Sequence, residues 1–278
     1  MIYCPYTDKD LDISKTNSEH IIPLSLGGVN GFEIPVCKNF NSWAGSKIDA
    51  KIANELIIQS RRTNLKVKSQ SRKIAEMYFK NARDEETGHL LQVKITKDQG
   101  IRARAPYVEE GSKAPTGKTI QFSVTGDIDI WLRYVAKVSL SAGYFAYGNL
   151  FRKNVNTVDL RNIMTKSNDE LLKKHSDMNV HAHYLYMGDE TQEIKLYKHI
   201  CKAVGNHSCV GIIPSNKYLT FFVGILGGYI GLIRVEADTR EFPNEKKYWW
   251  GHFMCPQSGQ LGRISYHRLM EKVVGVEN

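Results

Sequence analysis

Glu19 and His20 are adjacent in the sequence, and two further oxygen-bearing side chains, Asn41 and Asp49, follow them. Hydrolysis of a phosphodiester requires a base that activates water and a hard divalent cation that neutralises the scissile phosphate and the leaving oxygen. A neutral imidazole at His20 could accept the water proton, while Glu19 could offer an oxygen to Mg²⁺, Mn²⁺ or another divalent cation. A helix packed against that strand would bring the second oxygen ligand, for which Asn41 and Asp49 are the candidates.

These residues must be positioned by a small frame of strands and a helix. Residues 1–55 are dense in turn signals, contain the Gly27-Gly28 pair and end in a predicted helix. Within residues 41–60, apolar side chains recur near helical spacing, so one face of this helix can pack against a core; they are Trp43, Ile48, Ile52, Leu56 and Ile57.

Two motifs carry a family resemblance. Residues 19–28 read Glu-His-Ile-Ile-Pro-x-x-Leu-Gly-Gly, and residues 37–49 read Cys-x-x-x-Asn-x-x-x-Gly-x-x-Ile-Asp. Together they resemble the HNH endonuclease superfamily over residues 4–53, about a fifth of the chain. The resemblance implies a ββα-metal nuclease module in residues 1–55.

The resemblance also implies residue roles. His20 matches the general base, Glu19 the acidic metal ligand, and Asn41 the last residue of the motif, a catalytic and metal-binding position on the helix. Asp49 matches a recurrent acid, as an auxiliary ligand or a support for the helix. Other interpretations remain open, since Asn41 could cap a helix and Asp49 could be a surface carboxylate paired with Lys47 or Lys51.

The chain departs from the family at two places. Many members hold a structural zinc ion between two Cys-x-x-Cys pairs, whereas here Cys4 and Cys37 have each lost the second cysteine. Two thiolates do not make a four-ligand zinc site, so we expect no structural zinc. In its place we expect an apolar plug, and a Cys4–Cys37 disulfide is disfavoured in a reducing cytosol; the plug residues are Tyr6, Phe40 and Trp43.

The middle residue of the HNH triad is the second departure. Asn30 is the nearest asparagine but lies early, while Phe32 and Glu33 lie nearer the usual place. A backbone carbonyl could orient His20 instead. The sequence leaves these alternatives open.

The charge of the chain favours a polyanionic partner. The net charge is +9 and the pI about 9.2, and each phosphate that Lys or Arg neutralises releases counterions. Lys47, Lys51, Arg61 and Arg62 are the candidate phosphate contacts, although a solvated helix face would have the same pattern. The expected partner is DNA, and the sequence does not distinguish it from RNA.

Beyond the motif, the pattern predicts an α+β fold. We expect a basic helical connector over residues 56–88 and a larger α+β domain with antiparallel strands over residues 89–278, for target recognition or partner binding. A helix that is apolar nearly all round is predicted from Gly126 to Gly148. Shorter helices are predicted at 72–81, 154–164 and 265–274, and strands at 89–95, 118–124, 181–186, 209–213, 218–225 and 229–235.

Two further clusters have competing interpretations. His199-x-Cys201 and His207-x-Cys209, with His181 and His183, could ligate zinc, but the spacing matches no common zinc signature and favours buried thiols. Residues 248–250, Tyr-Trp-Trp, could stack on bases or form an interface or core cluster.

The remaining features bound location and function. No apolar run is long enough to span a membrane, no secretory signal is visible, and the five cysteines form no disulfide framework, so a cytoplasmic location without a membrane partner is expected. The resemblance implies a metal-dependent endonuclease that cleaves or nicks DNA in restriction, anti-phage defence or a mobile element. The alternatives are a non-catalytic nucleic-acid-binding protein and a nuclease subunit that requires a protein partner in a multi-component system.

Overall fold

The computed structural model describes residues 1–68, 73–123, 127–166, 170, 180–184 and 190–275. Both helices and sheets are present, and the strand pairs of the four sheets are antiparallel, which confirms the predicted α+β class. None of the helices in these ranges is long and apolar enough to cross a membrane.

The chain divides into two compact units. Unit 1 consists of residues 1–52 and 128–278, and unit 2 of residues 53–127. The predicted division at 55/56 and 88/89 therefore differs from the structural one, because residues 128–278 share a core with residues 1–52, and the segment between them folds by itself. Each unit is described separately below.

The N-terminal part of unit 1 is a pair of hairpins followed by a helix. β1 (Ile2–Cys4) pairs with β2 (Lys9–Leu11), and β3 (Thr16–His20) pairs with β4 (Glu33–Cys37) so that His20 lies opposite Glu33. β4 alternates buried and partly exposed side chains and leads directly into α1 (Lys38–Ala44). A π-helical turn, η3 (Gly45–Asp49), and α2 (Ala50–Asn54) continue the helix. A hairpin and a helix in this order are the arrangement that the motif predicted for these residues.

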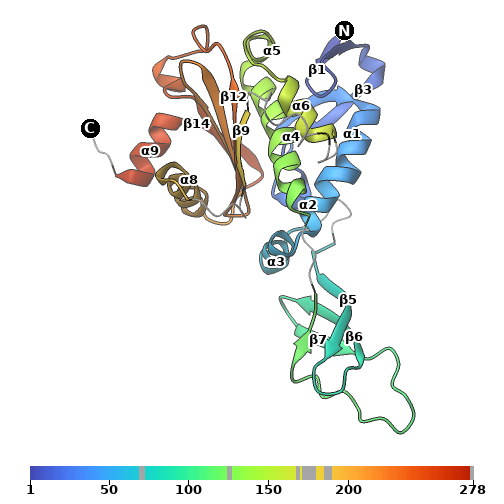
Figure 1. Ribbon diagram of the computed structural model, residues 1–278. Helices are drawn as coiled ribbons and strands as arrows, with labels where there is room; N and C mark the ends of the chain where they lie inside the picture. The colour runs from blue at the N-terminus through green and yellow to red at the C-terminus, as the bar shows by residue number, and fades with distance from the viewer. Residues whose placement is uncertain (69–72, 124–126, 167–169, 171–179, 185–189, 276–278) are drawn as a thin grey trace. The chain divides into compact units, whose positions relative to one another are not determined.

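The rest of unit 1 is a six-stranded sheet covered by helices on both faces (Figure 1). α4 (Ile128–Tyr147) contacts the four strands β9 to β12 on one face, while α8 (Gln192–Ala203) and α9 (Tyr266–Val274) cover the other around Phe222 and Tyr266. The strand order is β14-β13-β10-β11-β12-β9. The strands are β9 (Val180–Tyr184), β10 (Cys209–Pro214), β11 (Tyr218–Ile225), β12 (Gly228–Glu236), β13 (His252–Gln257) and β14 (Gln260–Ser265).

α4 is the central helix of unit 1. It contacts the sheet on one side and β4 and η3 on the other, and its middle turns are buried all round. The predicted helix over residues 126–148 is thereby confirmed, and its lack of a polar face has a physical reason, since both of its sides are covered. α5 (Asn149–Asn154) and α6 (Val158–Thr165) follow it; the helix predicted at 154–164 is α6, which begins four residues later, and α5 was not predicted.

Unit 2 is a small sheet of order β7-β6-β5-β8 with one helix, α3 (Leu56–Asn64). β5 (Met77–Asp84), β6 (Leu90–Thr96), β7 (Gly100–Arg104) and β8 (Ile120–Gln121) enclose a small core built on Ala82, Leu91 and Val93. The predicted helix at 72–81 is wrong. Residues 77–81 belong to β5, in which Phe79 packs against this core opposite Val93 on β6. A connector that is helical throughout residues 56–88 is therefore also wrong.

The remaining predicted strands are confirmed, except that β8 has two residues and residues 185–186 lie outside the described ranges. The helix predicted at 265–274 is α9. The sheet strands β13 and β14 were not predicted.

The loop that carries the glycine pair of the motif is hydrogen-bonded to Ser208, which precedes β10 of the sheet. The Ser208 hydroxyl donates to the Leu26 carbonyl at 2.5 Å and accepts from the Leu226 amide at 3.0 Å. A Cβ on Gly28 would lie 1.7 Å from the carbonyl oxygen of Ile22, which is a backbone clash.

Gly28→Ala is expected to lower the free energy of unfolding by more than about 2 kcal/mol, because two backbone segments must separate. The matched control is Gly45→Ala, where φ is −57° and the added Cβ has no neighbour within 4 Å. It should leave stability unchanged or raise it by about 0.5–1 kcal/mol, as Ala does within helices. Urea unfolding midpoints measure both. Equal midpoints for the two variants would contradict this account of the loop.

Candidate active site

His20 ends β3 at a partly exposed position with a defined orientation. Its side chain is 25% exposed, and Nε2 lies 3.2 Å from both Asn30 Oδ1 and Glu33 Oε1. Both oxygens are acceptors, so this pairing places the ring proton on Nε2 and leaves Nδ1 as the basic nitrogen. The imidazole is therefore held in the tautomer that a general base requires.

Glu33 is itself held in place by hydrogen bonds. The Ser18 hydroxyl donates to Glu33 Oε2, and the Gly31 amide donates to Oε1 at 3.3 Å. The hydrogen bond from Ser18 is the main reason that the pKa of Glu33 lies below its ordinary value, which keeps the carboxylate ionised beside His20. Among the candidates for the middle residue, Asn30 and Glu33 thus share the contact, whereas Phe32 is buried and its carbonyl accepts from the Ile21 amide.

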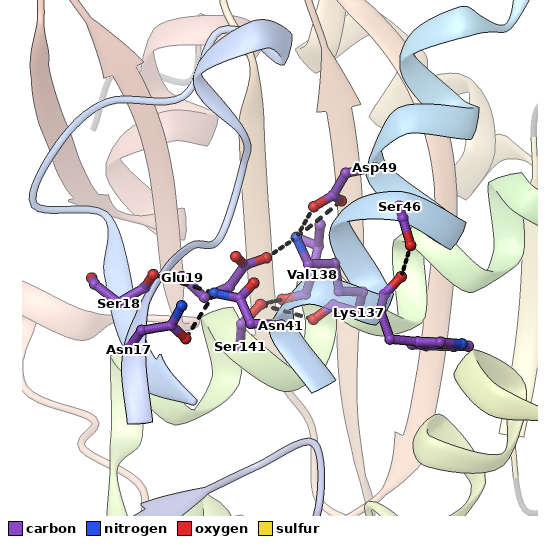
Figure 2. A network of polar contacts seen from close by, with 10 residues as sticks. Asn17, Ser18, Glu19, Asn41, Ser46, Asp49, Lys137, Val138 and Ser141 are labelled. Atoms are coloured by element: carbon purple, nitrogen blue, oxygen red, sulfur yellow. Dashed lines mark hydrogen bonds and ion pairs between the residues drawn. The ribbon is translucent and has the colours of Figure 1, made fainter. Parts of the chain in front are cut away.

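Asn41 lies on α1 beside the same strand. Its side-chain amide donates to Asn17 Oδ1 at 3.0 Å and to the Ser18 carbonyl at 3.4 Å (Figure 2). Asn41 lies inside the helix, whose N-cap is Cys37, so the alternative that it caps a helix is wrong. Because the amide nitrogen is used, the Oδ1 atom is the one left to bind a ligand.

A lysine that the motif does not contain meets the two carboxylates. Lys137, on α4, donates to Asp49 Oδ1 and Oδ2 at 2.9 and 2.7 Å and forms an ion pair with Glu19 Oε1 (Figure 2). Its side chain is fully buried, while those of Glu19 and Asp49 are 11% and 12% exposed. The ammonium group therefore joins β3, η3 and α4 at one point.

Burial dominates the electrostatics of this cluster. Burial raises the pKa of Asp49 to about 6, with a further contribution from Glu19, and Lys137 only partly offsets this. Burial acts in the opposite direction on Lys137, but Asp49, Tyr6 and Glu19 together hold its pKa well above the ordinary value. Asp49 and Lys137 thus form a buried ion pair in which the pKa values of both groups lie above their ordinary values.

Only some of the oxygen atoms of Glu19, Asn41 and Asp49 are left to bind a divalent cation. Asp49 has both oxygens bound to Lys137, which leaves it a poor metal ligand, and its burial means that it is not the surface carboxylate of the alternative interpretation. Glu19 uses Oε1 for Lys137, which leaves Oε2, and Asn41 offers Oδ1. The described residues contain no cluster of three or more His, Cys, Asp or Glu side chains that could hold a metal. Two oxygens fit Mg²⁺, which is commonly held by one or two carboxylates plus substrate phosphates and water.

The four predicted phosphate contacts separate into two groups. Lys47 and Lys51 are exposed, on η3 and α2 of unit 1. Arg61 and Arg62 belong to unit 2. Arg62 is 8% exposed and donates from Nη1 to the Ala53 carbonyl at 2.9 Å, so the prediction that it contacts phosphate is wrong. Arg61 is half-buried.

The three aromatic residues expected to form a plug contact one another. Tyr6 and Phe40 have ring centroids 5.3 Å apart, and Phe40 and Trp43 5.0 Å apart. That this cluster replaces a structural zinc ion stays a prediction. Cys4 and Cys37 are free thiols, and the Cys37 amide donates to Cys4 Sγ at 3.3 Å.

The His-x-Cys pairs and the aromatic residues 248–250 were the two other clusters considered for a binding role. Cys201 and Cys209 are buried with their sulfur atoms 3.8 Å apart, whereas His199 on α8 is exposed, so the His-x-Cys pairs do not converge. Trp249 and Trp250 are 40% and 55% exposed, and both rings contact His267.

No protein-family model, curated protein or solved structure matches the chain in the three comparisons made.

Lys137→Met is expected to lower the free energy of unfolding by about 3–5 kcal/mol, because it leaves Glu19 and Asp49 as buried anions without their cation. Adding Asp49→Asn should recover part of this loss, since one of the two stranded charges disappears. Chemical denaturation of the single and double variants measures their free energies of unfolding, and the difference gives the interaction energy between Lys137 and Asp49. Lys47→Met, which removes an exposed lysine on η3, is the control and should change stability by less than about 0.5 kcal/mol.

The raised pKa of Asp49 predicts a pH dependence. Its folded pKa of about 6 exceeds the ordinary 3.8, so the folded state binds this proton more tightly. The stability of the native protein relative to Asp49→Asn should therefore be highest below pH 4 and fall as pH rises to about 6, by up to about 1.4 kcal/mol per pH unit. Unfolding curves between pH 4 and 8 test this. A difference that grows with pH would mean that Lys137 outweighs burial.

Proposed function

We propose that the chain is a metal-dependent endonuclease of the HNH type that hydrolyses phosphodiester bonds in DNA. One observation carries the proposal: Glu19 and His20 end β3, Asn41 on α1 is hydrogen-bonded to Asn17 and Ser18 of the same strand, and Glu33 and Asn30 orient the imidazole. This is the base-plus-oxygen-ligand set that phosphodiester hydrolysis needs.

The residues would act as follows. His20 accepts the proton of the attacking water at Nδ1, and Glu33 stabilises the imidazolium that forms by holding Nε2–H. Glu19 Oε2 and Asn41 Oδ1 would hold the cation, with Asn17 and Ser18 fixing the Asn41 amide. A bound Mg²⁺ or Mn²⁺ supplies charge neutralisation at the scissile phosphate and the leaving oxygen. Lys47 and Lys51 are proposed to contact flanking phosphates.

A second candidate is supported by Lys137. The ammonium group competes with a metal for Glu19, and a buried ion pair of this kind holds the carboxylate without any metal. On this alternative the chain is a nucleic-acid-binding protein on an HNH scaffold, or a nuclease subunit that is completed by a partner protein. A role in restriction, anti-phage defence or a mobile element rests on the resemblance alone.

The purified chain is expected to cleave or nick supercoiled plasmid with Mg²⁺ or Mn²⁺ and to be inactive in EDTA. His20→Ala should reduce the rate about 10²–10⁴-fold, which is the usual contribution of a positioned base. Glu19→Gln and Asn41→Ala should raise the metal concentration that gives half-maximal activity. Gel electrophoresis of the supercoiled, nicked and linear plasmid over time measures the cleavage rate of the native protein and of the three variants.

His199→Ala is the matched control, because this histidine is exposed on α8 and away from the motif. It should cleave at the native rate. Native protein that shifts DNA in a gel without cutting it would contradict the endonuclease proposal for the isolated chain and favour the second candidate.

A further inference from the structure

One face of the unit 2 sheet presents cations and a tyrosine in register. Tyr78 on β5 lies opposite Lys94 on β6, which lies opposite Arg102 on β7, so these three side chains form a row across the strands. The neighbouring row pairs Gln92 with Arg104. Opposed residues of antiparallel strands project from the same side of the sheet. The other side carries the small apolar core of the unit.

This face, called the basic face and defined by Tyr78, Gln92, Lys94, Arg102 and Arg104, is partly ordered by its own contacts. Gln92 Oε1 accepts from Tyr78 OH at 3.2 Å and from Arg104 Nη2 at 3.1 Å. These contacts hold the tyrosine ring and one guanidinium group side by side. Tyr78 is nevertheless 48% exposed, and all of β7 is exposed.

The charges on the basic face are not balanced. Lys94 has an exposed ion pair with Glu76 at 2.9 Å, while the side chain of Arg102 has no ion pair or hydrogen bond to any residue in the described ranges. Like charges directly opposite one another destabilise an antiparallel pair, so the Lys94–Arg102 pairing works against the sheet. An anion bound between them would remove this repulsion. The repulsion between Lys94 and Arg102 therefore favours an anionic ligand, and this argument does not depend on how exposed the face is.

We propose that the basic face of unit 2 binds the phosphodiester backbone of nucleic acid. Arg102, Arg104 and Lys94 contact phosphate oxygens, and the exposed ring of Tyr78 packs on a sugar or a base. The surface lies outside the residues of the candidate active site, so this inference extends the proposed function and does not require that His20 catalyses cleavage.

The test measures binding in the full chain with His20→Ala and EDTA, so that the outcome is independent of cleavage. Fluorescence anisotropy with labelled duplex and single-stranded DNA is recorded over a salt series. Arg102→Gln/Arg104→Gln should flatten the dependence of log affinity on log salt by about 2, since each lost phosphate contact removes about 0.9 for duplex DNA. Duplex and single strand together show which form the face prefers.

The control is Lys113→Gln/Lys118→Gln, which removes the same charge from exposed loop positions of the same unit. It should leave the slope within about 0.5 of the native value. Equal losses in the two double variants would overturn the proposal, because general charge would then explain binding. Binding of an acidic peptide or of phosphatidylserine vesicles, with no binding of DNA, would overturn it as well.

A stability measurement separates binding from folding. Arg102→Gln alone should leave the Tm unchanged or raise it, because it removes the opposed like charge. Reduced DNA binding with an unreduced Tm supports a binding role for the arginine. A fall in Tm that accompanies the lost binding would overturn it.

Discussion

The buried ion pairs of Lys137 with Glu19 and Asp49 are the interaction that joins the parts of unit 1. The ammonium group lies between Glu19 on β3 and Asp49 on η3, and it comes from the central helix α4. Removing a charge of this kind from water is costly unless its partners are well placed, and here two carboxylates meet it. The hairpins and helix of residues 1–52 therefore belong to one compact unit with residues 128–278. They share their polar centre with the helix that also covers the six-stranded sheet.

The same interaction determines which atoms remain for chemistry. By taking both oxygens of Asp49 and one of Glu19, Lys137 reduces the carboxylate ligands available to a cation to a single oxygen, Glu19 Oε2. Asn41 then becomes important, because its amide nitrogen is tied to β3 and its oxygen is free to bind. A site with so few protein ligands depends on substrate phosphates to complete the coordination of a cation. Metal binding and DNA binding are then coupled in the proposed nuclease.

The parts of the fold that were predictable from sequence are those with local signals. The motif around Glu19 and His20 indicated a hairpin and a helix, and the all-round apolar pattern near Trp131 indicated the buried helix α4. Lys137 is visible in that pattern as one charged residue on a helix without a polar face, which requires a buried partner. Its partners could not be read from the sequence, because the pairing joins residues 88 positions apart.

Unit 2 was mispredicted because its charge pattern resembles a solvated connector. Lys and Arg residues between positions 47 and 73 suggested a basic helical connector over residues 56–88, yet Arg62 is buried against a backbone carbonyl and residues 77–84 form a strand. The strand signal in β5 is weakened by the register shift between Phe79 and Ala82, which interrupts the alternation of buried and exposed positions. Once the strands are aligned, other basic residues, farther along the chain, come together. Lys94, Arg102 and Arg104 lie on one face of the sheet, where they can act together on one polyanion.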